Sequence, residues 1–228
     1  MQALLRSFGS TTGRKIVMGL TGLLWFGFLL THLAANLLLL VPDEGKAFNL
    51  YAHGLAQLGP LLYLAELGLL GALGLHVFTA ARLQIGKRLA RTQRYAVSAS
   101  AGGPSRLGVA SLSMAYTGLL LLAFLVVHLK GFKFGPETMV SYDGLEVRDL
   151  KFLVVQTYQD PLWVAGYMGV MVVLGIHLRH GLWSAAQSLG VSHPRWAPLL
   201  ERTGSGAAVL MALGFFVIPI AIFVGVGQ

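Results

Sequence analysis

The chain has 228 residues, of which 55% are hydrophobic and 11% are charged. It contains no cysteine, which excludes disulfides, iron–sulfur clusters held by this chain and covalently attached c-type haem. The net charge of +8 lies mostly in connections on one side of apolar segments, a distribution that argues against nucleic-acid binding.

Five apolar runs follow one another along the chain. Four of them carry no charged residue, and one carries a single acid, Glu66. Each is long enough to cross a hydrocarbon core of ~30 Å as a helix, and none has the polar stripe of a soluble helix. The sequence therefore predicts an all-α fold, one integral membrane domain over residues 1–228 with five transmembrane helices. The expected spans are approximately 15–41, 60–86, 107–133, 161–188 and 203–227.

Two further segments bear on this topology. The first run is too long for a signal peptide, and no convincing small-residue cleavage site follows it, so we expect it to remain as a span. The polar connection 135–160 is expected to be partly ordered, and its apolar stretch 152–156 is too short to span.

The basic residues divide unevenly between the two sides of the expected bundle. The side on which the chain begins carries one acid, Glu201, whereas the opposite side has five basic residues and seven acids. This bias predicts a multi-pass protein of the cytoplasmic (inner) membrane, with the N-terminus in the cytoplasm and the C-terminus outside. The connection 87–106 is then cytoplasmic, and it either only sets the topology or also docks a peripheral partner. The basic residues of the first side are Arg6, Arg14, Lys15, Arg82, Lys87, Arg88, Arg91, Arg94, Arg106, Arg179, Arg195 and Arg202.

Each of the first four spans contains a histidine, and the fifth has none. They are His32, His76, His128 and His177. A single histidine on a helix is more often a hydrogen-bonded core residue than a ligand, but ionisable groups inside a membrane are costly and usually functional. One histidine in each of four spans therefore indicates a site.

The depths of the four histidines sort them into two pairs. His32 lies 17 residues beyond Lys15, roughly 25 Å along a helix, and His128 lies similarly far from its basic connection. His76 and His177 lie close before Arg82 and Arg179. We name His32 and His128 the outer pair, and His76 and His177 the inner pair; the vertical gap between them is on the order of 15 Å.

Two pairs at two depths favour bis-histidine haem, in which facing helices each supply one imidazole to the iron. Zinc would need three or four ligands around one point, and a proton relay would need a continuous chain of groups. Small residues beside the ligands would make room for a haem, although ordinary packing of membrane helices explains them equally well. These small residues are Ala72, Ala80, Gly169 and Gly181.

Basic residues near the inner pair are candidates for contacts with haem propionates, and interface anchoring is the equal alternative. They are Arg14, Lys15, Arg82 and Arg179. His180 is a weaker ligand candidate, because it lies lower in the membrane and no second histidine is ready at its level to bind the same iron.

Several segments resemble the cytochrome b membrane subunit of succinate:quinone oxidoreductases of the single-chain, five-helix, di-haem type. They are HLRHGLWSAAQSLG (177–190), THLAANLLLL (31–40) with AFNLYAHGLAQLGP (47–60), and LHVFTAARL (75–83). Fumarate reductases of the same build are similar. The resemblance covers nearly the whole chain and is weakest in the loops and the last span.

This resemblance implies that the outer pair binds the iron of one haem b and the inner pair that of a second, the pairing that depth also indicates. A histidine four residues before the glycine of Gly-Leu-Trp belongs to the family pattern, which selects His177 over His180. The resemblance also implies a flavoprotein subunit and an iron–sulfur subunit docked on the cytoplasmic face. Electrons would pass between that subunit and a membrane quinone, commonly menaquinone, as in respiratory complex II of the tricarboxylic acid cycle.

Related enzymes place an acid for quinone chemistry near the outer haem. Glu66 lies ten residues before His76, about 15 Å along a helix, and thus near the outer level. An intramembrane carboxylate is a functional candidate, and a structural hydrogen-bonded Glu66 is the alternative. His53 and Gln57, which we expect in a loop, are further quinone candidates.

Other classes of protein are compatible with the same histidine pattern. A di-haem cytochrome b anchor of a hydrogenase or formate dehydrogenase would share the haem chemistry. A transporter that uses the histidines for protons or metal ions, or a purely structural anchor, would bind no haem.

Overall fold

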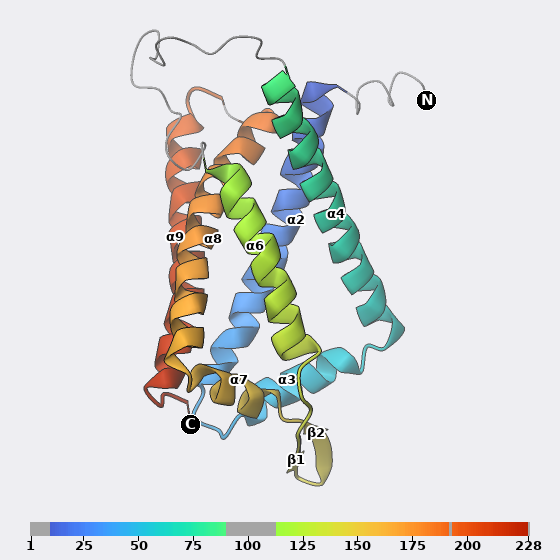
Figure 1. Ribbon diagram of the computed structural model, residues 1–228, viewed down its shortest axis with the longest axis vertical. Helices are drawn as coiled ribbons and strands as arrows, with labels where there is room; N and C mark the ends of the chain where they lie inside the picture. Colours follow the sequence, from blue (N-terminus) through green and yellow to red (C-terminus); the bar gives the residue numbers. More distant parts are fainter. Residues whose placement is uncertain (1–9, 90–112, 192, 228) are drawn as a thin grey trace.

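The computed structural model describes residues 10–89, 113–191 and 193–227. Five long helices run side by side, and short helices and one hairpin close one end of the bundle (Figure 1). The long helices are α2 (Thr11–Leu37), α4 (Pro60–Leu89), α6 (Met114–His128), α8 (Pro161–Ser188) and α9 (Ala197–Phe223). The shorter elements are η1 (Leu38–Leu40), α3 (Lys46–Ala56), the π-helical segment η2 (Leu129–Lys133), β1 (Met139–Tyr142), β2 (Leu145–Arg148) and α7 (Leu150–Tyr158).

The helices α2, α4, α8 and α9, and α6 continued by η2 as far as Lys133, are each long and apolar enough to cross a membrane. This confirms the predicted fold class, a helical bundle with five candidate membrane spans. The strands of the hairpin pair antiparallel, and Met139 lies opposite Arg148. We call the end formed by α3, α7 and the hairpin the hairpin end, and the end at which α2 begins the amino end (Figure 1).

The helix bounds differ from the expected spans where charged residues continue a helix. α9 begins at Ala197, before the expected start at 203, and its first turns include Glu201 and Arg202. A run defined by the absence of charge misses such turns, because long charged side chains can reach the membrane surface from a helix end. The expected residues 107–112 of the third span lie outside the described part of the chain.

The main core lies between α8, α9 and α2. Its buried members at mid-bundle are Met171, Leu174, Leu178, Ala208 and Met211. A Cβ placed on Gly175 would lie 3.0 Å from that of Ala212, so this glycine lets α8 and α9 approach closely.

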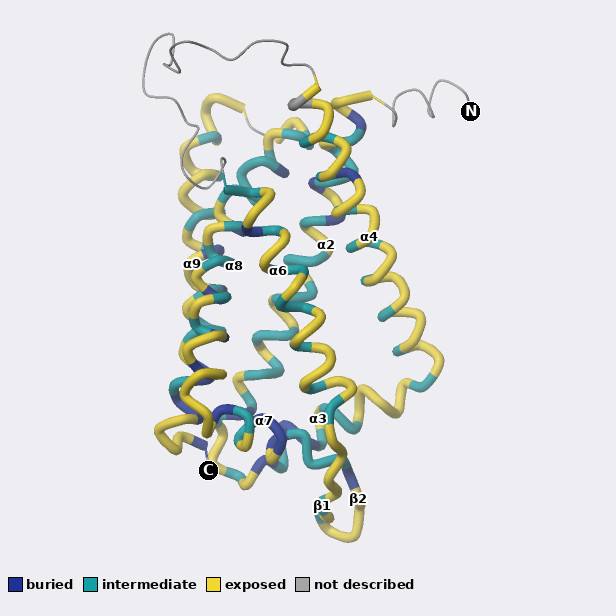
Figure 2. Tube along the Cα trace, in the orientation of Figure 1, coloured by how far each residue is buried: buried dark blue, intermediate teal, exposed yellow. Residues whose placement is uncertain are grey.

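Much of the outer side of the bundle is exposed, most evidently along α4 (Figure 2), and many of the exposed side chains are large and hydrophobic. Leu64, Leu67 and Leu70 on α4 expose about two-thirds of their surface, at 66%, 65% and 63%. A contiguous apolar surface of this kind would aggregate in water, but hydrocarbon is a suitable solvent for it.

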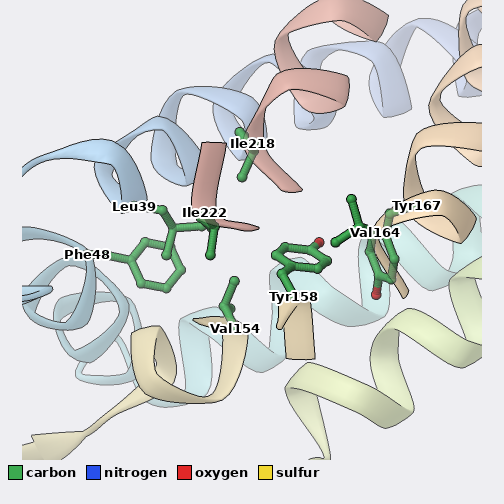
Figure 3. Packing of buried hydrophobic residues seen from close by; sticks show 8 residues of the cluster. All are labelled: Leu39, Phe48, Val154, Tyr158, Val164, Tyr167, Ile218 and Ile222. Atoms are coloured by element: carbon green, nitrogen blue, oxygen red, sulfur yellow. The ribbon is translucent and has the colours of Figure 1, made fainter. Parts of the chain in front are cut away.

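A second apolar cluster closes the hairpin end, where α7 and α3 meet the ends of α2, α8 and α9 (Figure 3). Its buried residues are Leu39, Phe48, Val154, Tyr158, Val164, Tyr167, Ile218 and Ile222. The nine-residue helix α7 contains the stretch 152–156 and lies across the end of the bundle, so this stretch does not span, as predicted.

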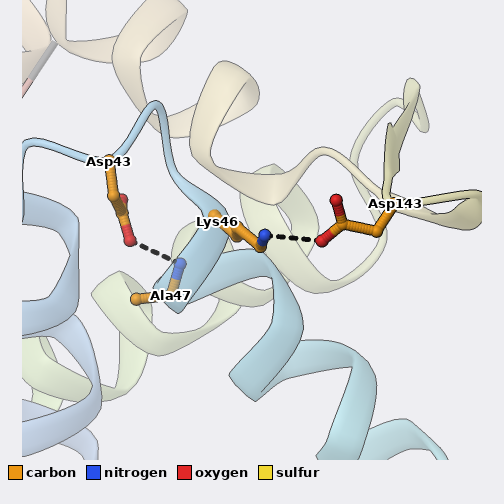
Figure 4. A network of polar contacts seen from close by, with 4 residues as sticks. All are labelled: Asp43, Lys46, Ala47 and Asp143. Carbon is orange, nitrogen blue, oxygen red and sulfur yellow. Dashed lines mark hydrogen bonds and ion pairs between the residues drawn. The ribbon is translucent and has the colours of Figure 1, made fainter.

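Polar contacts hold the hairpin against α3. Asn49 is fully buried, and its side-chain amide donates to Tyr142 Oη at 3.0 Å and to Asp149 Oδ1 at 2.9 Å. Lys46 Nζ donates to Asp143 Oδ2 at 2.7 Å, and Asp43 Oδ2 accepts from the backbone N–H of Ala47 at 2.8 Å (Figure 4). The hydrogen bond lowers the pKa of Asp143 and raises that of Lys46, but exposed pairs of this kind stabilise little. The buried amide is therefore the stronger anchor of the hairpin.

Candidate functional site

The outer pair lies near the hairpin end. His32 is in the last turns of α2 and His128 is the last residue of α6, and their ring centroids are 5.8 Å apart with an interplanar angle of 87°. Aromatic rings surround the two imidazoles. They are Phe28, stacked on His32 at 5.4 Å, Phe215 at 5.8 Å from the same ring, and Phe124 and Phe132 at 5.5 and 5.4 Å from His128.

The inner pair lies on the other two helices that carry a histidine. His76 is on α4 and His177 is on α8. Thr21 Oγ1 on α2 lies 3.1 Å from His76 Nδ1, and Thr117 Oγ1 on α6 lies 3.1 Å from His177 Nδ1. Each inner imidazole is thus bridged to a helix that carries an outer one.

These threonine contacts give the vertical distance between the pairs. Thr21 marks the inner level on α2 and His32 the outer level on the same helix, eleven residues further on. At 1.5 Å per residue, the two levels are ~16 Å apart. The four histidines therefore form two pairs at two depths.

In three of the four imidazoles, Nδ1 lies within hydrogen-bond distance of a polar group. His76 Nδ1 also lies 3.2 Å from the carbonyl oxygen of Met18, and His128 Nδ1 lies 3.4 Å from Tyr167 Oη. A hydrogen bond at Nδ1 orients the ring and directs Nε2 to another ligand, the arrangement found around metal-bound histidines.

The residues fit a bis-histidine haem in several respects. Two imidazoles bound on opposite sides of one metal have ring centroids roughly 6 Å apart, because each metal–nitrogen bond is ~2 Å. The outer pair matches this separation. Within the described residues, no three or more histidines or carboxylates gather as they would around zinc.

Two features of α2 add to this fit. A Cβ at Gly22 would lie 3.3 Å from Cε1 of His76, so only glycine gives that ring comfortable space. The indole Nε1 of Trp25 is buried without a hydrogen-bond partner in the described part of the chain. It lies between Thr21 and His32 in sequence, and a buried unpaired donor is a group that a bound ligand can satisfy.

The propionate candidates all lie at the amino end, near the inner pair. Lys15, Arg82 and Arg179 are exposed, and Arg14 is half-buried. The guanidinium of Arg82 lies over the Phe78 ring at 5.4 Å. His180 interacts electrostatically with His177. Among the described residues, no hydrogen bond or ring contact joins these four cations to one another.

The three quinone candidates lie at the hairpin end in two separate contacts, one between Glu66 and Lys133 and one between His53 and Gln57. Glu66 Oε1 accepts a hydrogen bond from Lys133 Nζ, which joins α4 to η2. His53 Nε2 and Gln57 Nε2 lie 3.1 Å apart. The expectation that His53 and Gln57 lie in a loop is wrong, because His53 is in α3 and Gln57 is its C-cap. Residues 46–56 form a short helix at the hairpin end, and a search for long charge-free runs does not find a helix of this length.

A cavity of about 390 Å³ opens beside the outer pair. Tyr167, whose hydroxyl contacts His128, forms part of its wall. Trp163 and Phe132 supply aromatic surface, and Gln156, Thr157 and Asp160 supply polar groups. An apolar cavity with a few polar groups is typical of sites for small amphipathic ligands.

Sequence reasoning missed Thr21, Thr117 and Tyr167 as partners of the histidines. Both threonines begin the same four-residue sequence, Thr-Gly-Leu-Leu, at the same distance before a histidine, a pattern visible without a structure. Tyr167 gives no such pattern, because only the packing of α8 against α6 brings it to His128.

Comparison with known protein families, with curated proteins and with solved structures gives no match. The functional conclusion therefore depends on the geometry of the histidines and on the residues around them.

Proposed function

We propose that this chain is the membrane anchor and electron-transfer subunit of a succinate:quinone oxidoreductase, and that it holds two b-type haems. The observation that carries the proposal is the arrangement of four histidines as two pairs, at two levels ~16 Å apart, on four membrane helices. Haem b, when bound, supplies reversible one-electron transfer.

In this proposal the residues of the chain orient the haems and shield them from water. His32 and His128 hold one haem iron, and His76 and His177 hold the other. The aromatic rings around the outer pair exclude water, which affects the potential of a buried redox group. Arg14, Lys15, Arg82 and Arg179 are the cations available to propionates at the amino end.

We assign the quinone reaction to the hairpin end, at the outer pair. The cavity beside His128 supports this, because it offers aromatic surface and polar groups within one side chain of the histidine. Glu66 is the candidate for proton exchange, and His53 and Gln57 are further candidates at the same end. Menaquinone is the expected quinone.

The iron–sulfur subunit, with the flavoprotein subunit behind it, is assigned to the amino end. The basic residues at that end support this, since they greatly outnumber the single acid expected on the same side, Glu201. The same charges support a cytoplasmic amino end in the inner membrane.

The decisive experiment is a pyridine haemochrome measurement on the purified protein, with the protein quantified independently. We expect two haems b per chain. A colourless protein would overturn the proposal in favour of a transporter or a structural anchor, and one haem per chain would contradict the paired arrangement. Reduction of both haems by succinate in the isolated complex, and not by hydrogen or formate, distinguishes this subunit from other di-haem anchors.

A further inference from the structure

Two stretches of the chain repeat the same pattern on two helices. TGLLWFGFLLTHL (21–33) on α2 and TGLLLLAFLVVHL (117–129) on α6 and η2 are identical at eight of thirteen positions. The conserved spacing places a histidine eleven residues after each threonine. The partner helices repeat too, with LGLHV (73–77) on α4 and LGIHL (174–178) on α8. The chain thus contains two copies of one helix-pair unit.

The repeated threonines make the same contact in both units. Each Oγ1 lies 3.1 Å from Nδ1 of the inner histidine on its partner helix, across 55 residues in the first unit and 60 in the second. Both threonines are buried, at 9% and 6% exposure. The glycine that follows each threonine faces the same ring, since a Cβ on Gly22 or Gly118 would lie 3.3 or 3.5 Å from the Cε1 of His76 or His177.

The hydrogen-bond directions follow from the neighbouring groups. The Thr21 hydroxyl donates to the carbonyl oxygen of Val17 at 2.8 Å, so it accepts from His76. The Met18 carbonyl at 3.2 Å from the same Nδ1 can only accept, which requires a proton on that nitrogen. The Thr117 hydroxyl likewise has carbonyl acceptors in its own helix, Ser113 and Met114, both at 3.1 Å.

From these contacts we infer that Thr21 and Thr117 are positioning residues that tune the inner haem. Each hydroxyl holds the Nδ1–H of an inner imidazole, so that Nε2 carries the lone pair and is the nitrogen left to bind a metal. A hydrogen bond accepted from Nδ1–H makes the imidazole more basic, which stabilises ferric iron and lowers the midpoint potential. At the outer pair, His128 Nδ1 lies 3.4 Å from the phenol oxygen of Tyr167, and no contact between a threonine and an outer imidazole is found in the described part of the chain. The inference rests on the proposed haem ligation.

The test replaces each hydroxyl by a methyl group of the same shape, in Thr21→Val and Thr117→Val. The readout is a redox titration of the two haem components in the purified complex, with the inner component assigned from its loss in His177→Ala. We expect both valine variants to raise the midpoint potential of the inner component and to leave the outer one unchanged. Thr21→Ser and Thr117→Ser keep the hydroxyl and should behave as the wild type.

Two threonines provide matched controls. Thr31 lies next to His32 but is exposed, and its hydroxyl donates to the Phe28 carbonyl of its own helix at 2.9 Å. Thr79 is buried three residues after His76 and bonds to the Leu75 carbonyl, at 2.6 Å. Thr31→Val and Thr79→Val should shift neither component.

The outcomes separate this inference from the proposed function. Loss of the inner haem in a valine variant that its serine counterpart retains also supports the positioning role. Unshifted valine variants, or serine variants that behave as the valine ones, would overturn the inference while a two-haem wild type upholds the proposed function. A wild-type protein without haem would overturn both.

Discussion

The α8 ligand has two candidates three residues apart, His177 and His180. His177 Nδ1 contacts Thr117 on α6, and the inner histidine of α4, His76, has the equivalent contact with Thr21 on α2. We predict that His177→Ala leaves one haem per chain, with the outer component intact, and that His180→Ala retains two. Haem content and the spectra of the two variants check this, and the reverse result would transfer the ligand role to His180.

Glu66 is the candidate for proton exchange with the quinone, and the structure also places it in an ion pair. Its carboxylate is paired with Lys133, which gives it a partner on η2 that the sequence did not indicate. If Glu66 also exchanges protons with the quinone, Glu66→Gln should retain both haems and lower quinone turnover by ~10²-fold, because general acid–base groups typically contribute at least that much. Steady-state assays with a soluble quinone analogue measure this.

Two variants control for the ion pair and for the location of the quinone. Lys133→Gln breaks the same pair but keeps the carboxylate, so equal effects of Glu66→Gln and Lys133→Gln on turnover would mark the carboxylate as structural. Gln156→Leu alters the cavity wall without touching Glu66. It should raise the KM for quinone, and an unchanged KM would exclude the cavity as the binding place.

At the scale of elements, the hairpin supports the end of the helix that carries His128. Arg148 on β2 donates to four carbonyl oxygens at the end of η2 and just after it, those of Phe132 (3.0 Å), Lys133 (3.3 Å), Gly135 (3.1 Å) and Pro136 (3.2 Å). These carbonyls have no further turn of helix to bind them, and a cation is favourable at a helix C-terminus. Phe132 in turn packs on the His128 ring.

We therefore predict that Arg148→Met destabilises the fold by ~1–3 kcal/mol, the cost of leaving such acceptors unpaired, and weakens retention of the outer haem. Thermal unfolding in detergent and haem content measure the two effects. Lys46→Met is the control, because it breaks only the exposed pair with Asp143. A full haem content and unchanged unfolding temperature in Arg148→Met would show that the hairpin does not support His128.

At the scale of the whole molecule, charge distinguishes the two ends. The amino end presents Lys15, Arg82 and Arg179, whereas the hairpin end carries most of the acids. We predict that lysine- and carboxyl-directed cross-linking of the intact complex joins the iron–sulfur subunit to the amino end, because an acidic docking face would be attracted there. Cross-links found only at the hairpin would reverse the assignment of the two ends.

The sequence by itself determined the five membrane helices and the residues that make the site unusual. An uninterrupted apolar run of this length has one stable form in hydrocarbon, because backbone groups must be bonded within the segment. The depth of each histidine then follows from a fixed rise per residue, which is why two levels were predictable. The Thr-Gly-Leu-Leu repeat can likewise be recognised from the sequence alone.

Only the tertiary structure decided which side chains meet across helices. Helical periodicity does not specify the rotation of one membrane helix against another, which depends on close packing such as that at Gly175 and Gly22. The partners of Glu66 and His128 are consequences of that packing. Lys133 is 67 residues from Glu66, and Tyr167 is 39 from His128, separations over which sequence patterns carry no information about contact.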